Sequence, residues 1–274
     1  MVNAVERWAE LLPGWGLPEE IIARAVESPW GFPPELMKRR GQTATALDPS
    51  LSTRRAAEAL PEDGDVLDVG VGGGAASLPL ASKAGRITGV DESEGMLGAF
   101  REAAAGAGVV VSTVLGGWPE VAEEVTPADV VVCHHVLYNV RSLGPFVRAL
   151  DEHARRRVVI EITERHPLAW MSDLWVRFHG LDRPDGPTAA DAADALVELG
   201  CPAQREVETR RSGSSGFERR EDALSLIRRR LCLPPERDPE VAEALGDRLA
   251  KHDGMWSAGP AEQTVATLWW NGRH

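Results

Sequence analysis

A glycine-rich turn after a short apolar run is the stretch whose residue types could hold a ligand. Residues 66–69 read Val-Leu-Asp-Val, an apolar run typical of a strand buried on both faces. The run stops at Gly70, Gly72 and Gly74, residues that tolerate positive φ and have no side chain to keep a ligand off the backbone. Residues 75–83 then predict a helix, whose first amides would point back at the turn.

A second apolar run, residues 87–90, ends in Asp91, about 20 residues further on, where a carboxylate that binds ribose belongs. Strand, glycine turn, helix, strand and acid together form a unit for holding a nucleoside-bearing cofactor. The letters also fit the dinucleotide pattern G-x-G-x-x-A, starting at Gly70. Asp68 favours a different ligand, because a carboxylate at this place would repel a pyrophosphate but suits an ammonium group and a sulfonium.

The pattern Asp68-x-Gly70-x-Gly72-x-Gly74, followed by Asp91, resembles the first two motifs of the class I S-adenosylmethionine-dependent methyltransferases. Residues 128–140 are similar to the fourth motif of that family, a strand that opens with Asp and ends beside the transferred methyl group. The resemblance spans about residues 60–165. It implies an α/β fold with a doubly wound, seven-stranded, mostly parallel sheet, an antiparallel last strand and a helical N-terminal cap. It also implies S-adenosyl-L-methionine as the cofactor.

The resemblance also assigns cofactor contacts. Asp68 and the glycine amides would face the methionine portion, and Asp91 would accept hydrogen bonds from the ribose hydroxyls. Gly117 stands where the family usually has an acid for the adenine amino group, so we expect backbone groups and the indole of Trp118 to serve there. The cofactor-binding residues expected in this way are Asp68, Gly70, Gly72, Gly74, Asp91, Glu92, Gly117, Trp118 and Cys133.

Methyl transfer needs alignment of nucleophile, methyl group and sulfur, and a base helps when the nucleophile is a hydroxyl. His134 and His135 follow the fourth expected strand, and histidine titrates near neutrality. Adjacent side chains diverge there, so we expect at most one of the two to face the pocket, with Tyr138 on the same rim. Two further pairs are base candidates: Glu164 with His166, and His179 with Trp175. No diagnostic ligand spacing accompanies these histidines, and we expect no metal.

The charge and composition of the 274-residue chain narrow the class of partner. A net charge of -12 argues against a non-specific grip on nucleic acid, and the Asn/Asp-Pro-Pro-Tyr/Phe motif of amino-methylating enzymes is absent after the fourth strand. Four basic clusters, at 38–40, 155–157, 210–211 and 228–230, are expected on solvated faces. Three widely spaced cysteines, no signal peptide and no bilayer-length apolar run predict a cytoplasmic protein without a membrane partner.

Residues 1–50 are expected to form a helical cap segment packed on the same domain, and residues 51–274 the Rossmann-like methyltransferase domain. Trp30 and Phe32, in a proline-rich loop, could belong to a lid over the cofactor or could pack the cap helices, and the sequence leaves both open.

The last two expected strands, 203–209 and 264–270, are separated by a long excursion. We expect a mobile loop at 212–216 and helices at 218–231 and 239–251 within it.

These features predict a methyltransferase for a small-molecule acceptor, with O-methylation favoured over N- or C-methylation. An NAD(P)-dependent oxidoreductase is one alternative, but it would require a fingerprint near the N-terminus and a Tyr-x-x-x-Lys pair, and the chain has neither. A non-catalytic, cofactor-binding regulatory protein of the same fold is another, and methylation of a protein or RNA docked on an arginine cluster is a third. A homodimer is left open.

Overall fold

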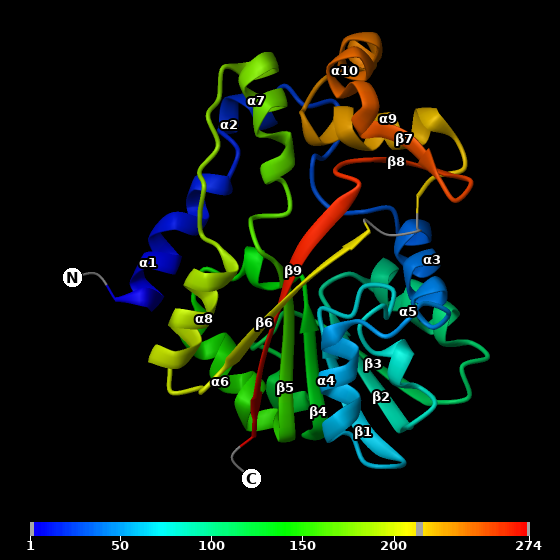
Figure 1. Cartoon of the computed structure of the whole chain (residues 1–274), viewed down its shortest axis with the longest axis vertical. Helices are drawn as coiled ribbons and strands as arrows, with labels where there is room; N and C mark the ends of the chain where they lie inside the picture. The colour runs from blue at the N-terminus through cyan, green and yellow to red at the C-terminus, as the bar shows by residue number, and fades with distance from the viewer. Residues whose placement is uncertain (1–2, 212–215, 273–274) are drawn as a thin grey trace.

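A computed structural model describes residues 3–211 and 216–272 as a seven-stranded sheet with helices on both faces (Figure 1). The strand order is β3-β2-β1-β4-β5-β9-β6, and β9 alone runs antiparallel to its neighbours within the sheet. This arrangement confirms the expected fold class. The strands are β1 (Gly64–Val69), β2 (Ala84–Asp91), β3 (Val110–Leu115), β4 (Ala128–His134), β5 (Ala154–Thr163), β6 (Gln204–Arg211) and β9 (Glu262–Asn271).

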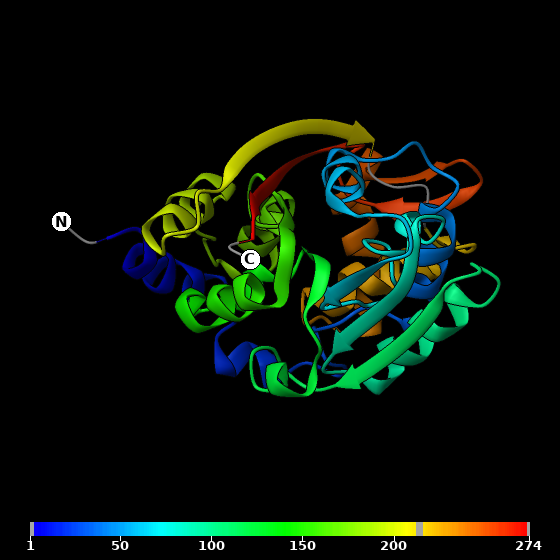
Figure 2. The same cartoon turned by 90° about the horizontal axis from the view of Figure 1, so that it is seen from below.

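The helices fall into three groups by position. Two cover one face of the sheet, three cover the other, and the rest lie beyond the carboxyl ends of the parallel strands or on the glycine-rich turn (Figures 1 and 2). They are α1 (Ala4–Leu11), α2 (Glu19–Ile22), α3 (Pro34–Ala44), α4 (Leu51–Ala59), α5 (Glu94–Ala104), α6 (Leu143–His153), α7 (Ser172–His179), α8 (Ala189–Glu198), α9 (Arg220–Arg230) and α10 (Asp238–Leu245).

Alternation along the strands builds two apolar cores. Successive side chains of a strand point to opposite faces, so Val130 packs in the core shared with α4 and α5, while Val131 packs in the core shared with α1, α6 and α8. Trp269 and Trp270 of β9 divide in the same way. Figure 2 shows the two groups of helices on opposite sides of the sheet. The sheet is therefore covered on both sides, and ligand access is left to the ends of the strands.

A third apolar core lies in a cap beyond the carboxyl ends of the parallel strands. It joins α7, α9 and α10 through residues such as Leu174, Leu231 and Val241. Leu17 and Ile21, from the segment around α2, pack against the same cluster. The cap also carries a two-stranded hairpin, β7 (Leu249–His252) and β8 (Met255–Ala258). Residues far apart in the sequence thus form one layer at the upper end of the molecule in Figure 1.

Two expected helices differ in the structure. Residues 75–83 form turns and a short 3-10 helix, Leu78–Leu80, because Pro79 has no N–H for a helical hydrogen bond. The helix expected at 239–251 ends at Leu245, and β7 and β8 follow. Asp253 and Gly254 form the hairpin turn with φ angles of 49° and 85°, as a type I′ turn requires.

The expectation that the basic clusters lie on solvated faces is wrong for one residue, Arg228. Arg228 is only 4% exposed and pairs with Glu27 and Asp238. Arg210 contacts the buried carboxylate of Glu161. Burial of Arg228 is tolerated because its guanidinium meets two acids, whereas the side chain of Arg210 stays 36% exposed.

Residues 212–215, most of the expected mobile loop at 212–216, lie outside the described residues. Over 3–211 and 216–272, no helix combines the length and apolar character needed to cross a bilayer.

Candidate active site

The turn after β1 has the positive φ angles that its glycines predict: 74° at Gly70, 51° at Gly72 and 83° at Gly74. Helix α3 lies directly on this turn. A Cβ added at Gly73 would come within 2.0 Å of the carbonyl oxygen of Met37, so only glycine permits this approach. The sequence analysis missed this close packing, although it expected helices in the first 50 residues.

Asp68, at the end of β1, is 1% exposed and keeps one oxygen without a partner. Its Oδ2 accepts a hydrogen bond of 2.6 Å from the Ser77 hydroxyl, whereas its buried Oδ1 meets no donor among residues 3–211 and 216–272. Burial raises the pKa of Asp68 from 3.8 to about 7; the Ser77 hydrogen bond opposes this shift, and the charge of Asp91 adds to it. A donor or cation brought to Oδ1 would satisfy the carboxylate.

Asp91 stands at the end of β2, between the glycine turn and α5. Its Oδ2 accepts a hydrogen bond of 3.0 Å from the amide of Gly72, and its Oδ1 accepts one of 2.9 Å from the amide of Ser93. Each carboxylate oxygen has a second lone pair, so the group can still accept bonds from a diol. The two amides therefore fix the carboxylate in place without exhausting it.

Two carboxylates lie beside Gly117, where the family resemblance predicts the adenine. A Cβ at Gly117 would be 3.0 Å from Oε1 of Glu92 and 3.1 Å from Oε2 of Glu120. The indole of Trp118 lies against α6, because its Nε1–H donates to the carbonyl of Phe146 at 3.3 Å. Glu120, which the sequence analysis did not single out, is thus better placed beside Gly117 than the Trp118 ring.

Cys133 and His134 close β4 with inward-facing groups. Cys133 is fully buried in the core shared with α6, and burial raises the pKa of its thiol. Nε2 of His134 is buried and has no hydrogen-bond partner in the described part of the chain. Burial also lowers the pKa of His134 to about 4. Both groups are therefore neutral near pH 7.

His135 leaves the strand in a left-handed conformation, with φ of 60°, and its side chain is 43% exposed. Its Nε2 lies 3.1 Å from Oε1 of Glu161, and its amide donates to the Glu161 carbonyl at 2.7 Å. Glu161 also accepts a 2.7 Å hydrogen bond from the Ser52 hydroxyl and contacts Arg210. The structure therefore separates the two adjacent histidines and gives one of them a carboxylate partner.

The charge of Glu161 is held by its neighbours. Burial alone would raise the pKa of this carboxyl, but the hydrogen bond with His135 and the nearby positive charge of Arg210 hold the pKa well below its usual range. An ionised carboxylate against one imidazole nitrogen fixes the tautomer and the orientation of the ring.

Tyr138 and His166 form an aromatic group beside this pair. The Tyr138 hydroxyl bonds to the Thr163 hydroxyl at 2.5 Å and accepts from the Thr163 amide, and burial raises its pKa. The ring of His166 lies 5.4 Å from that of Tyr138 and stacks on Trp15 at 3.9 Å. Burial and the charges of two nearby arginines lower the pKa of His166 to about 3. Both groups are therefore neutral near pH 7 and shape the wall of the site.

The other base candidates are engaged elsewhere. Glu164 pairs with Arg205 at 2.5 Å. Nε2 of His179, in the cap, lies 2.7 Å from the carbonyl oxygen of Leu231, and its ring packs beside Trp175. Across the described ranges, no group of three or more His, Cys, Asp or Glu residues has the arrangement of a metal site.

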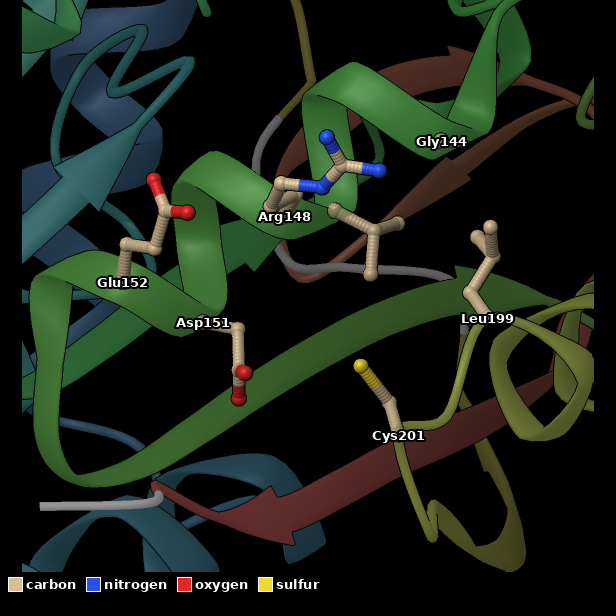
Figure 3. A pocket seen from close by; sticks show the side chains of 7 residues that line it. Gly144, Arg148, Asp151, Glu152, Leu199 and Cys201 are labelled. Atoms are coloured by element: carbon tan, nitrogen blue, oxygen red, sulfur yellow. The ribbon is translucent and has the colours of Figure 1, made fainter.

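A cavity of about 300 Å³ lies at the other edge of the sheet, where α6 ends and β6 begins (Figure 3). Figure 3 shows Asp151 and Cys201 pointing into the space between α6 and the segment before β6. Because this place is at the amino ends of the parallel strands, the cavity is separate from the candidate active site.

Three residues of the site could not be found from local motifs. Ser52, Glu161 and Arg210 come from α4, β5 and β6, and only folding brings them together. The one sequence signal was Glu161 itself, a lone charge inside the apolar run at 158–162.

Comparison with known proteins agrees with this geometry. Residues 66–157 match a family described as a methyltransferase domain. A protein of Bacillus halodurans C-125, provisionally assigned as a methyltransferase, is 17% identical and has a TM-score of 0.52; the match covers 80% of this chain and 96% of that one. A cyclopropane-fatty-acyl-phospholipid synthase-like protein of Lactobacillus casei is 14% identical with a TM-score of 0.52, over 92% and 98% of the two chains.

An uncharacterized protein of Haemophilus influenzae is 28% identical over 213 residues, which are 76% of each chain. The two solved structures show the shared fold, and the family match adds the activity of the domain. The match over residues 66–157, within this shared fold, supports a class I, Rossmann-like S-adenosylmethionine-dependent methyltransferase. The chain is an enzyme that uses S-adenosyl-L-methionine to methylate an acceptor.

The residues at the strand ends fit this cofactor. Asp68 offers an acceptor without a donor, Asp91 offers free lone pairs, and the glycine turn allows close approach to the backbone. When bound, S-adenosylmethionine supplies a methyl group activated by its sulfonium.

Proposed function

We propose that the enzyme transfers the methyl group to a hydroxyl of a small molecule, with His135 as the general base. The observation that carries this proposal is the contact of 3.1 Å between Nε2 of His135 and the buried carboxylate of Glu161. Glu161 holds the proton on Nε2, which leaves the lone pair of Nδ1 to accept a proton from the acceptor. The positive charge that develops on the ring is stabilised by the same carboxylate.

The position of His135 supports this role. Val136, the next residue, approaches the glycine turn so closely that a Cβ at Gly70 would be 2.3 Å from its Cγ2. His135 therefore leaves β4 beside the turn that we assign to the cofactor. An acceptor placed over the end of β4 would have the base on one side and the cofactor on the other, as an in-line transfer needs.

We assign the cofactor contacts as follows. Asp91 accepts from the ribose hydroxyls, and Asp68 and the turn of Gly70, Gly72 and Gly74 face the methionine portion. Glu92 and Glu120, beside Gly117, take the adenine end.

Cys133, His134, Tyr138 and Trp118 receive packing roles. Their burial, or their hydrogen bonds to the protein, support this assignment better than direct contact with reacting atoms.

Other expectations stay predictions. These are the small size of the acceptor, the cytoplasmic location, the division into a cap segment at 1–50 and a domain at 51–274, and a homodimer.

The proposal is tested by incubating the full chain with methyl-labelled S-adenosylmethionine and a panel of small phenols, hydroxy acids and their amine counterparts. We expect the label on oxygen, and we expect His135→Asn to lower kcat by about 10²–10⁴-fold. Asparagine tolerates the left-handed backbone of this position, so the variant should fold. His252→Asn, at an exposed histidine of β7, is the matched control and should keep the wild-type rate.

Label on nitrogen or carbon, or an unchanged rate in His135→Asn, would contradict the proposal. Cofactor binding without transfer to any member of the panel would favour the regulatory alternative.

A further inference from the structure

The last turn of α9 places a half-buried arginine, Arg230, against an aromatic ring, although the sequence predicted a solvated cluster there. The guanidinium carbon of Arg230 lies 4.3 Å from the centre of the Phe32 ring. The guanidinium carbon of Arg40, from α3, lies 5.0 Å from the same ring. Phe32 therefore joins a cap helix to the helix that covers the glycine turn, and two cations meet at it.

The neighbours of Phe32 on one side, and a charge interaction with His166 on the other, place Arg230 near the candidate active site. Towards the cofactor turn, Nη1 of Arg40 lies 3.9 Å from Sδ of Met37, and Cε of Met37 lies 3.1 Å from where a Cβ of Gly72 would be. Towards β5, Arg230 is near enough to His166 for its charge to help lower the pKa of that imidazole. Arg230 thus lies between the glycine turn and the end of β5.

Within the described residues, no acid neutralises Arg230. Arg228, two positions earlier, is more deeply buried and has Glu27 at 3.1 Å and Asp238 at 3.0 Å. Arg230 has neither an ion pair nor a hydrogen bond in the described part of the chain, and its contact there is the Phe32 ring. Burial, followed by the charges of Arg229 and Arg40, lowers the pKa of Arg230 to about 10.

A second arginine near the site already uses both terminal nitrogens of its guanidinium. Arg183 donates to the backbone carbonyls of Gly16 and Trp15 and lies over the rings of Trp15 and Trp175. Its planar group is held in the aromatic wall. Arg230 keeps its donors for a ligand.

We propose that the methyl acceptor carries an oxyanion that binds the guanidinium of Arg230, an inference that rests on the proposed function. The oxyanion is a carboxylate or a phosphate. A partly desolvated cation without an acid costs free energy, and a bound anion removes that cost. Guanidinium matches the geometry of either oxyanion with two parallel hydrogen bonds. Phe32 backs the guanidinium, and the hydroxyl of the acceptor faces His135.

The test uses the full chain saturated with S-adenosylhomocysteine and three probes of one shape: 4-hydroxybenzoate, 4-hydroxyphenyl phosphate and neutral 4-hydroxybenzamide. Binding is measured by calorimetry for the wild type, for Arg230→Gln and for Arg220→Gln. Arg220 is at the other end of α9, over the ring of Trp256, and makes the charge-matched control. We expect at least one anionic probe to bind better than the amide. We also expect Arg230→Gln to lower the affinity for that probe by about tenfold to a hundredfold. Arg220→Gln should leave this affinity unchanged.

A second measurement does not depend on the shape of the acceptor. Inorganic phosphate, compared with chloride at equal ionic strength, should raise the melting temperature of the wild type and of Arg220→Gln, but not of Arg230→Gln. Phosphate stabilisation that is equal in all three proteins, or absent from all of them, would overturn the proposal, as would anionic probes that bind Arg230→Gln as well as wild type.

Preference for one anionic probe identifies the oxyanion as carboxylate or phosphate. Failure of S-adenosylhomocysteine to bind any of the proteins would be a failure of the proposed function instead.

Discussion

Asp68 is a buried carboxylate with one oxygen that has no hydrogen-bond partner in the described residues. Its folded pKa of about 7 lies above the ordinary 3.8, so between these values the folded chain holds a proton that the unfolded chain has released. Raising the pH from about 4 to about 7 therefore destabilises the ligand-free protein through this group. Above pH 7 this loss of folding stability is complete, and it amounts to a few kcal/mol at most.

Asp68→Asn should consequently be more stable than wild type without cofactor at pH 8, and the difference should shrink as the pH falls to 5. Thermal melts of both proteins at pH 8 and pH 5 measure this difference in stability. Asp65→Asn, at a half-exposed carboxylate of the same strand, is the matched control. Identical pH dependence in wild type and Asp68→Asn would show that burial does not raise this pKa.

The residue scale also shows what local motifs can and cannot predict. Asp68, Asp91 and the glycines were predictable because one strand-turn-strand unit contains them all. The group around Glu161, the partner of His135, was not, because Ser52 and Arg210 reach Glu161 from positions 109 and 49 residues away in the sequence. Trp118 illustrates a different limit: the sequence places the residue beside Gly117 but does not say which way the indole turns.

At the scale of elements, the packing of α3 on the glycine turn offers a sharp test. A Cβ at Gly41, in α3, would come within 1.8 Å of the carbonyl oxygen of Gly73. Alanine is the better helix former by about 1 kcal/mol, yet Gly41→Ala should lower the melting temperature and weaken S-adenosylhomocysteine binding, because the clash pushes α3 off the turn.

Gly98→Ala is the matched control, since it lies within α5 and its nearest neighbour to an added Cβ is a side-chain atom of Arg101 at 3.9 Å. It should keep the affinity and hold or raise the melting temperature. Equal effects of the two variants in melting and calorimetry would argue against a role for α3 in holding the turn.

Helices and strands were predicted correctly where hydrophobic periodicity was strong. They were missed where a turn-forming residue determined the local structure. The buried strands β1, β4 and β5 follow from their apolar runs. The hairpin of β7 and β8 was missed although Asp253-Gly254 is a strong turn signal, because the preceding residues continued a helical pattern. Pro79 had a similar effect at the expected helix 75–83.

At the scale of the whole molecule, an acidic chain places several of its arginines inward. The net charge of -12 keeps the surface negative, while Arg210, Arg228 and Arg230 lie at the site or in the cap above it. Composition alone could not reveal this, because it averages over surface and interior. The cap is also a product of the whole chain, since its core combines residues near position 20 with residues beyond position 170.

In the site that we propose, the ends of β1 and β2 hold S-adenosylmethionine, with Asp91 on the ribose. The most direct measurement is calorimetric titration of the full chain with S-adenosylhomocysteine and with NADH, repeated on Asp91→Ala after its folding has been checked by melting. Binding of S-adenosylhomocysteine in the micromolar range, lost in Asp91→Ala and absent for NADH, is the predicted result. Binding of NADH, or affinity for S-adenosylhomocysteine that survives the loss of Asp91, would contradict the account.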